Sequence, residues 1–369
     1  MRAACPPDMR LTVDLAPSDF AAKPRVIARV EGLTATAFRF DSGIAALRID
    51  NDVGHVVLLP FQGQQVWDAT FHGRRLTMQS VFAEPVEARD LLSSYGAFFV
   101  HCGATAMGNP GAEDHHPLHG ELPLAPFQSA TLLSGSEGDG PYMGLAGSYR
   151  HRLAFSHHYV AEPELLLHHG TGLLDLHLRI RNCRQSPMEL MYLAHVNFRP
   201  VDGAHLVDTV PDDPARMRIR TRLPGYFAPS AERESLLARL AAEPALHRRI
   251  VAGQRIEPEL VMGLDFEADE TGFAHAMQIH PSGEADVVSH RPGELPRAVR
   301  WITRNGDEDA LGLTLPGTAE ADGYTAEKRK GNLVTLAADG VFSCHVRFGA
   351  LTQKAAEELA ARIARVRSR

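Results

Sequence analysis

The sequence lacks any run of hydrophobic residues long enough to cross a membrane. A membrane-spanning helix needs about 20 consecutive apolar residues, and the apolar stretches of this chain are much shorter. The N-terminal segment MRAACPPD has no apolar stretch after its single basic residue, so we expect no secretory signal peptide. These absences predict a cytoplasmic protein that does not bind membranes.

Cysteine is scarce as well. The 369 residues include only 4 cysteines, and no two of them form a Cys-x-x-Cys pair. Small exported domains use closely spaced cysteines as a disulfide frame. The wide separation found here predicts free core thiols at Cys5, Cys102, Cys183 and Cys344.

Positive charge is also in deficit. Lys and Arg number 38 against 45 Asp and Glu, which gives a net charge of −7. Nucleic-acid binding depends on a basic surface that neutralises phosphates, and attachment to anionic lipids needs basic residues too. The composition therefore argues against nucleic-acid and membrane partners. With 44% hydrophobic residues, the chain can still bury a large core.

Short β-branched or alternating runs, divided by Gly, Pro, Asp and Asn, make up most of the chain and are typical of strands. The clearest runs are Thr34–Phe40, His55–Leu59, Leu173–Ile180, Leu190–Asn197, Leu260–Phe266, Ala298–Thr303, Leu311–Leu315 and Phe342–Phe348. Many short strands with frequent turns predict an all-β sandwich or barrel.

Two segments have the spacing of helices. They are Ser230–Arg249, which Pro244 interrupts, and Thr352–Val366, with Thr352 as its N-cap. Length alone suggests two or three domains, but a single all-β domain can exceed about 200 residues. We expect one domain over residues 1–369, with residues 1 to about 30 peripheral, an insertion at 209–250 that carries the first helix, and a C-terminal helix at 352–369.

Histidine is unusually abundant in one part of the chain. Of the 19 histidines, twelve lie between His101 and His205. The passage from His101 to Pro123 mixes glycines, prolines and histidines without amphipathic period, which predicts a loop, and loops on rigid scaffolds often carry sites. Within it, His115 and His116 are either solvated turn residues or site residues, and His119 is the stronger candidate for a site.

Two later passages add polar candidates. The strand Leu190–Asn197 places His195 and Asn197 on one face, because residues two apart in a strand point the same way. The pair either faces a cleft or is buried and satisfied by backbone carbonyls. Further on, the charged run from Glu327 to Lys330 is either a solvated surface or part of a site.

The order of these passages resembles a known family. A His-Gly loop at Leu118–Pro123, then a strand with His195-x-Asn197-Phe198, then a late Leu-Gly-x-x-x-Pro-x-Thr beginning at Leu311, is similar to the galactose mutarotase-like (aldose 1-epimerase) proteins. It is most similar to their uncharacterised bacterial DUF4432 branch. The resemblance runs from about Leu33 to Leu351 and is most specific between Tyr95 and Pro200.

The resemblance implies an all-β fold, a β-supersandwich with a few short helices and an open cleft across one sheet. It also implies a cofactor-free isomerase acting on a small carbohydrate, in which a base removes the anomeric proton while an acid protonates the ring oxygen. By residue, His195 matches the acid histidine and His119 the second, substrate-positioning histidine. Whether the protein forms a homodimer stays open.

The chemistry of other side chains suggests further substrate contacts. Asn109 and Asn197 would bond sugar hydroxyls, and the face of Trp67 would pack on the sugar ring unless Trp67 is a core residue. The remaining candidates for contact with the substrate are Gln65, His101 and Glu327.

The chain departs from the family pattern at the base. The family carries Glu-Pro where this sequence has Leu315-Pro316, and leucine cannot accept a proton. Glu121, Glu320 and Glu327 are the replacement candidates, and Glu121 would share a side with His119 if that segment were extended. The family's arginine-bearing glycine motif is also not evident near Arg74 and Arg75.

Three functions therefore stay open from the sequence. The first is an isomerase of the aldose 1-epimerase type, and the second is a sugar-binding or sensing protein that has lost the base. The third is a metal-dependent isomerase or lyase, because histidines and carboxylates often bind divalent metals. Its ligands would come from His115, His116, His119 and Glu121, together with His101, although their spacing matches no standard metal motif.

Overall fold

Two antiparallel sheets dominate the computed structural model, which describes residues 10–225, 227–228 and 230–368. The nine-stranded sheet has the order β1 (Leu11–Leu15), β9 (Ser129–Glu137), β10 (Gly140–Leu153), β11 (His157–His168), β12 (Gly172–Asn182), β22 (Val341–Leu351), β18 (Ala285–His290), β17 (Ala274–Ile279) and β14 (His205–Asp208). The prediction of an all-β supersandwich is confirmed.

The second sheet has thirteen strands. Its main path is β15 (Met217–Ile219), β16 (Ile256–Leu264), β19 (Arg297–Arg304), β20 (Asp309–Gly317), β13 (Met188–Val196), β8 (Phe99–Ala104), β6 (Val66–Phe71), β5 (Gly54–Leu58), β4 (Ala45–Asp50), β3 (Leu33–Arg39) and β2 (Arg25–Val30). Off this path, β21 (Val334–Leu336) pairs with β13 and β7 (Arg74–Arg75) pairs with β6.

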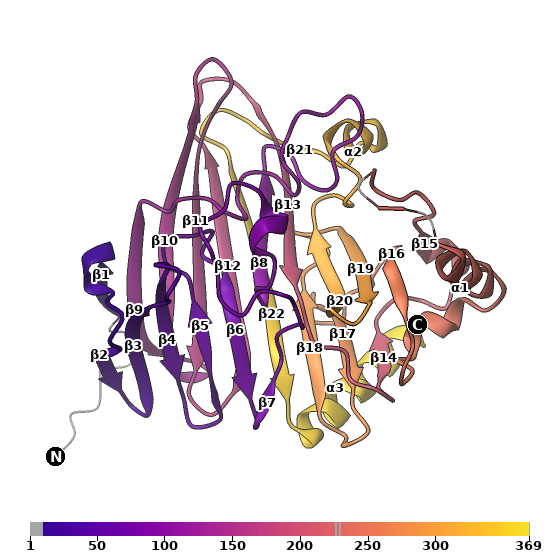
Figure 1. The fold of residues 1–369 in the computed structure, drawn as a ribbon, viewed down its shortest axis with the longest axis horizontal. Helices are drawn as coiled ribbons and strands as arrows, with labels where there is room; N and C mark the ends of the chain where they lie inside the picture. Colours follow the sequence, from indigo (N-terminus) through magenta and orange to yellow (C-terminus); the bar gives the residue numbers. More distant parts are fainter. Residues whose placement is uncertain (1–9, 226, 229, 369) are drawn as a thin grey trace.

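The two sheets stack face to face, and their inner faces form the main hydrophobic core (Figure 1). Strand β13 shows how the pleat divides the side chains. Tyr192, Ala194 and Val196 point into the core between the sheets, whereas Met191 and Leu193 join a smaller apolar cluster on the outer face of the thirteen-stranded sheet. This outer face is where the pocket described below opens.

Helices lie around the sheets (Figure 1). The α-helices are α1 (Ala231–Ala242), α2 (Tyr324–Lys330) and α3 (Gln353–Arg367), and the short 3-10 turns are η1 (Pro17–Asp19), η2 (Leu91–Ser94), η3 (Pro214–Arg216) and η4 (Pro244–Arg248). Of the α-helices in the described residues, none combines the length and apolar character that crossing a bilayer requires.

The predicted helix boundaries follow from capping chemistry. The Ser230 side chain accepts a hydrogen bond from the backbone N–H of Arg233 and starts α1, which ends before Pro244. The Thr352 hydroxyl caps α3 in the same way. Helix α2 was not predicted from the sequence. Its seven residues, which include Glu327 and Lys330, are too few to show helical spacing.

The cysteine prediction is correct for most of the residues that can be placed. Cys102 and Cys344 are buried free thiols, and burial raises the pKa of both. Cys183 is also free but only partly buried, so it is not a core thiol. Cys5 lies outside the described residues.

A buried ion pair connects the two sheets. Asp208 on β14 accepts a hydrogen bond of 2.9 Å from the guanidinium of Arg300 on β19, and neither side chain is exposed to solvent. Arg300 also donates to the backbone oxygen of Leu313 at 2.9 Å and contacts the Nδ1 atom of His247 at 3.1 Å. Removing one partner would leave a buried charge without compensation, which is costly in a low-dielectric interior.

We therefore expect Asp208→Ala to lower the free energy of unfolding by about 3–5 kcal/mol. Asp202→Ala is the matched control, because Asp202 pairs with Arg304 at the surface, where its side chain is 51% exposed. An exposed pair contributes about 1 kcal/mol or less. Denaturant unfolding of both variants measures the difference, and equal losses would contradict the role of the buried pair.

Candidate active site

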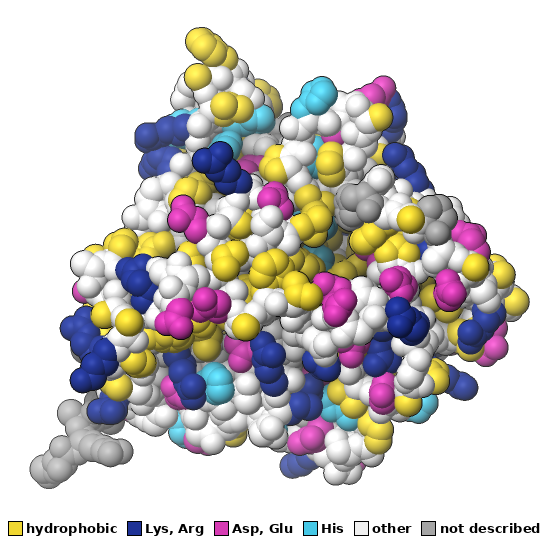
Figure 2. Space-filling model, viewed as in Figure 1, with side chains coloured by type: hydrophobic (Ala, Val, Ile, Leu, Met, Phe, Trp, Pro, Cys, Tyr) yellow, Lys and Arg dark blue, Asp and Glu magenta, His cyan; other side chains and the backbone are white. Residues whose placement is uncertain are grey.

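A pocket with a cavity volume of about 360 Å³ opens on the outer face of the thirteen-stranded sheet. Its floor comes from alternate residues of four neighbouring strands, β13, β20, β19 and β16. These floor residues are Leu193, His195, Leu315, Val299, Trp301, Thr303, Glu259 and Val261. Figure 2 shows the hollow near the middle of the molecule, with hydrophobic side chains around it and histidine at its floor.

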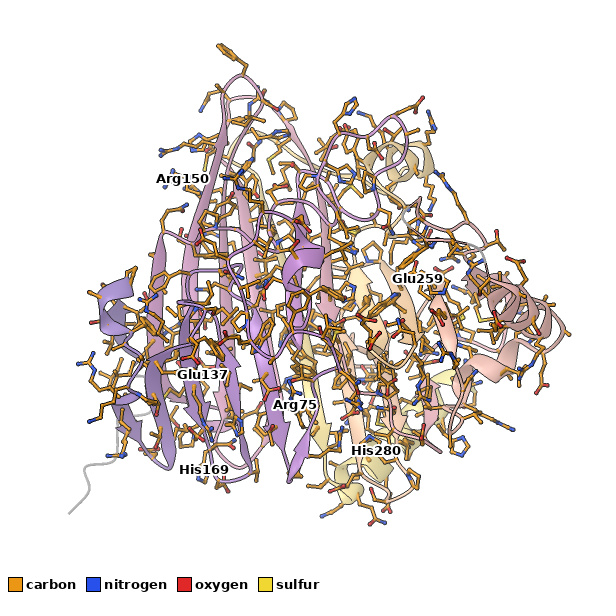
Figure 3. The ribbon with its side chains drawn as sticks, in the orientation of Figure 1. Arg75, Glu137, Arg150, His169, Glu259 and His280 are labelled. Atoms are coloured by element: carbon orange, nitrogen blue, oxygen red, sulfur yellow. The ribbon has the colours of Figure 1, made fainter. Side chains whose placement is uncertain are left out.

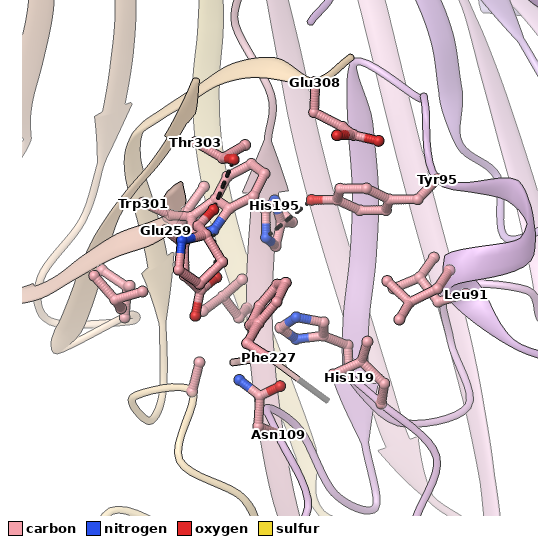
Figure 4. Close-up of a pocket in the computed structure, with 18 of the residues that line it drawn as sticks. Leu91, Tyr95, Asn109, His119, His195, Phe227, Glu259, Trp301, Thr303 and Glu308 are labelled. Atoms are coloured by element: carbon pink, nitrogen blue, oxygen red, sulfur yellow. Dashed lines mark hydrogen bonds between the residues drawn. The ribbon is translucent and has the colours of Figure 1, made fainter. Parts of the chain in front are cut away.

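Loops form the walls of the pocket. One wall follows strand β7 and leads into η2, a second belongs to the long loop between β8 and β9, and others come from the segment after β15 and the β19–β20 turn. The wall residues are Val81, Phe82, Leu91, Leu92, Tyr95, Asn109, Leu118, His119, Arg220, Phe227, Asn305 and Glu308. Figure 4 shows most of the polar ones converging on the same space.

His195 is placed by the pleat of β13, on the same face as Leu193. Its side chain is buried, and the hydroxyl of Tyr95 lies 3.4 Å from its Nε2 atom. Its Nδ1 atom is buried and has no hydrogen-bond partner among the described residues. Burial lowers the pKa of His195 to about 4, although its neighbour Asn197 opposes the shift. The imidazole is therefore neutral at pH 7.

His119 reaches the same pocket from the loop between β8 and β9. Its backbone is in the left-handed region, with φ of 60°, and is held by hydrogen bonds to Gly108 and from Gly103. The rings of His119 and His195 meet edge to face, with centroids 5.4 Å apart. Burial, followed by the proximity of His195, Arg220 and His116, lowers the pKa of His119 well below its ordinary value. The structure thus brings together the two histidines that the sequence singled out.

Leu315 lines the pocket with the two histidines. It lies on β20, is 2% exposed, and packs close to Gly312. The position at which the resemblance implies a glutamate is therefore apolar, and it belongs to the same cavity as His119 and His195. Among the residues that the structure describes, the carboxylates that line this cavity are Glu259 and Glu308.

Glu259 is a site residue that the sequence analysis missed. It extends from β16 (Figure 3), and both of its carboxylate oxygens accept hydrogen bonds, one from the Arg220 guanidinium and one from the indole N–H of Trp301 at 2.7 Å. The signal was available, because Glu259 and Val261 alternate with core residues along an otherwise apolar strand. Pro258 obscured it, since proline is typical of a strand boundary.

Trp301, not Trp67, is the tryptophan of the pocket. Its ring lies edge to face with His195, at a centroid distance of 5.5 Å, and with Tyr95, at 6.1 Å. Trp67 is 3% exposed and belongs to the apolar cluster beneath the loops. It is a core residue, which was the alternative left open for it.

Asn109 lines the pocket, whereas Asn197 supports it from behind. The side chain of Asn197 is buried, accepts a hydrogen bond from the Tyr95 hydroxyl at 3.2 Å and donates one to the backbone oxygen of Ala97 at 2.9 Å. Asn197 therefore positions Tyr95, which in turn contacts His195.

The structure corrects the placement of His101 and Gln65, neither of which lines the pocket. The pleat of β8 turns His101 toward the core between the sheets, where its Nδ1 atom lies 2.9 Å from the Tyr192 hydroxyl and burial lowers its pKa to about 3. Gln65 is fully buried and donates to the backbone oxygen of Pro123 at 2.8 Å.

Glu121 does not share a side with His119, so that prediction is wrong. The segment is not extended, because His119 and Gly120 both have positive φ. The carboxylate of Glu121 instead accepts hydrogen bonds from the backbone and hydroxyl of Thr105 and from the Tyr159 hydroxyl at 2.6 Å. It lines a separate pocket of about 910 Å³, together with His115 and His116.

Glu320 and Glu327 also lie outside the pocket with the histidines. Burial alone would raise the pKa of Glu320, but its hydrogen bonds with Lys330 and Arg218 outweigh this and lower it. Glu327 is buried in α2, where it accepts hydrogen bonds from Asn332 and Lys330, and burial raises its pKa. The hydrogen bonds of both carboxylates therefore stabilise the chain segment that follows β20.

The metal alternative finds no support in the geometry of its proposed ligands. His119 faces one pocket, whereas His115, His116 and Glu121 face the other. Within residues 10–225, 227–228 and 230–368, some groups of three His, Cys, Asp or Glu side chains have ligand atoms within 4.8 Å of one another. None of these groups includes any of the four residues or His101.

Arg74 and Arg75 have structural partners away from the pocket. Arg75 pairs with Asp68 at 2.6 Å and lies well apart from Glu259 in Figure 3. Arg74 pairs with the buried Asp286 of the other sheet. Among the residues that the structure describes, the cation that lines the pocket is instead Arg220.

Known structures share this fold. A candidate aldose 1-epimerase from Klebsiella pneumoniae aligns over 97% of this chain and 96% of its own, with a TM-score of 0.81 and 16% identity. A galactose mutarotase-like protein from Clostridium acetobutylicum aligns over 90% and 99%, with a TM-score of 0.57 and 14% identity. A galactose mutarotase related enzyme from Lactobacillus acidophilus aligns over 84% and 98%, with a TM-score of 0.53 and 10% identity.

At such identities the likeness shows the fold alone, and that fold is the one the resemblance implies. No curated protein matches the sequence. A family model described as a domain of unknown function matches residues 41–350, which is most of the chain. The protein therefore belongs to the DUF4432 family.

Proposed function

We propose that the protein is a carbohydrate isomerase of the aldose 1-epimerase type. It binds a sugar in the pocket and moves protons at the anomeric centre, so that the ring opens to the aldehyde and closes again on either face. The observation that carries this proposal is the meeting of His119 and His195 at 5.4 Å in one cavity, next to two carboxylates. The fold shared with mutarotase-like proteins supports it.

Both imidazoles are neutral at pH 7, because burial depresses their pKa values. A neutral imidazole offers one N–H donor and one bare nitrogen that accepts a proton. It can therefore give its N–H proton to the ring oxygen as the C–O bond breaks, and take that proton back when the ring closes. Neutral histidine polarises a substrate oxygen in the same way in other isomerases. His195, whose ring lines the cavity beside the Tyr95 hydroxyl, fits this role.

Glu308 is the better candidate for the base. Both oxygens of Glu259 already accept hydrogen bonds, which hold that carboxylate in a fixed ion pair with Arg220. No hydrogen bond from another described residue reaches the carboxylate of Glu308, so its oxygens are available to a sugar hydroxyl. In the view of Figure 4 the two carboxylates lie on either side of His195. Glu308 then removes the anomeric proton, and Glu259 orients the substrate.

A second function, sugar binding without catalysis, is favoured by one observation. Leu315 occupies the pocket at the position where the resemblance implies the catalytic glutamate. If Glu308 does not replace that group, the protein retains a sugar site but has lost the proton acceptor.

A first test compares anomer interconversion by NMR exchange or polarimetry across a panel of aldoses. We expect the protein to accelerate interconversion and His195→Ala to reduce the rate by about 10²–10⁴-fold, the usual contribution of a general acid or base. His115→Ala is the matched control, since His115 is an exposed histidine of the other pocket. Sugars that bind but interconvert no faster than in buffer would contradict catalysis and support binding alone.

A second test concerns the base. We expect Glu308→Gln to reduce the rate strongly, and Leu315→Glu in that variant to restore at least a tenth of it, because a carboxylate there faces the same cavity. Leu315→Gln in the same background supplies the shape without the charge and should restore nothing. If only the single variant Leu315→Glu is active and the natural chain is not, the binding function is the correct one.

A third test follows from the depressed pKa of His195. We expect the rate to be constant from pH 8 to about 5 and to fall toward pH 4 as the ring is protonated. In the unfolded chain histidine binds a proton below about pH 6.5, while the folded protein keeps His195 neutral, so this residue lowers the free energy of unfolding as pH falls from 6.5 to 4. NMR titration of the ring checks the pKa, and a midpoint near 6.5 would contradict burial of the imidazole.

A further inference from the structure

One part of the pocket floor, next to His195, is aliphatic. Leu193, Val261, Val299 and Leu315 stand on neighbouring strands of the sheet, and all four side chains line the cavity. The backbone groups beneath them are committed to the hydrogen-bond ladders between β16, β19 and β20. This floor therefore has almost nothing to offer a sugar hydroxyl, and a hydroxyl placed on it would lose its water without gaining a partner.

The rim next to this floor is also apolar. Val81 and Leu92 line the pocket with 63% and 50% of their surfaces exposed, which is unusual for large hydrophobic residues of this chain. A ligand seated in the pocket would cover them, and burial of apolar surface would then contribute to affinity. Polar groups of the cavity stand around this surface: Figure 4 shows Tyr95 and His119 on one side and Glu259 and Thr303 on the other.

The charges of the pocket disfavour an anionic ligand. Its charged side chains in the described residues are Arg220, Glu259 and Glu308. Arg220 is paired with Glu259, and its other nitrogen lies 3.6 Å from Asp322. With both histidines neutral, the carboxylate of Glu308 leaves the cavity negative. A sugar phosphate or sugar acid would meet repulsion, and Arg220, the lining cation in the described part of the chain, is already paired.

We propose, building on the isomerase function above, that the substrate is an uncharged deoxy sugar. Its anomeric centre and remaining hydroxyls face His119, His195 and Asn109, while its methyl or methylene group lies on the aliphatic floor of Leu193, Val261, Val299 and Leu315. A fully hydroxylated hexose has to bury a hydroxyl against that floor and is the poorer substrate.

The test measures kcat/KM for anomer exchange by NMR with pairs of sugars that differ by one hydroxyl, namely 6-deoxyhexoses and their parent hexoses, together with a hexose 6-phosphate and a hexuronic acid. A hydrophobic pocket discriminates against an added hydroxyl by up to about 10²-fold, so we expect the deoxy sugars to be preferred by about 10–100-fold. The charged sugars should be poorer still.

Variants locate the preference in the floor. Val261→Thr and Val299→Thr replace a methyl group by a hydroxyl of nearly the same shape, so each should reduce the ratio of deoxy sugar to parent hexose by about tenfold. Val57→Thr is the matched control, because Val57 is a buried valine of the same outer apolar cluster but does not line the pocket. It should leave the ratio unchanged.

The outcomes separate this inference from the proposed function. Equal rates for hexose and deoxy sugar, or a preference for a charged sugar, would overturn the deoxy-sugar assignment while leaving the isomerase intact. Tighter binding of deoxy sugars without any interconversion, measured by saturation-transfer NMR, would overturn catalysis and support the substrate class. Absence of both binding and exchange for every uncharged sugar would overturn both.

Discussion

The two-residue period of the strands at the centre of the thirteen-stranded sheet is the constraint on which the pocket depends. In β13, one set of side chains fills the core between the sheets, and the other set, with Leu193 and His195, faces outward. A shift of register by one residue would exchange the two sets completely. The core on one side therefore fixes which side chains are available to chemistry on the other.

Neighbouring strands repeat this division. Ile302 on β19 enters the core while Trp301 faces the pocket, and Leu260 on β16 enters the core while Glu259 faces the pocket. Four strands from distant parts of the sequence thus contribute one floor. The buried pair of Asp208 and Arg300 links the inner face of this region to the other sheet and holds the floor at a fixed position.

Burial also sets the chemistry of the two histidines. Removing an imidazole from water penalises its charged form, so the pKa of His195 falls to about 4 and that of His119 falls well below its ordinary value. The positive charge of each ring would in addition oppose that of the other. A pair of neutral rings has no charge to attract an anionic substrate, but each ring keeps one donor and one acceptor for a neutral one.

The sequence predicted the strands well, because alternation is a local property. His119 and His195 were also found from the sequence, since their motifs are short and lie in a recognisable order. The partners of these residues were harder to predict, because they depend on long-range pairing and on turns. Glu121 was misplaced by the left-handed backbone at His119, and Glu259 was missed because Pro258 suggested a later start for its strand. His101 was assigned to the site although the pleat of β8 turns it inward.

Leu315 shows why the identity of one residue does not settle the activity of the pocket. A base is useful wherever its oxygen can reach the anomeric hydroxyl, and a cavity walled by several loops offers more than one such place. Leucine at the position where the resemblance implies a glutamate leaves the floor without a carboxylate there and extends the aliphatic surface formed by Val261 and Val299. If Glu308 supplies the base from the β19–β20 turn, a leucine at position 315 both leaves the proton acceptor to another residue and adapts the floor to a less hydroxylated sugar. One side chain then accounts for the position of the base and for the choice of substrate.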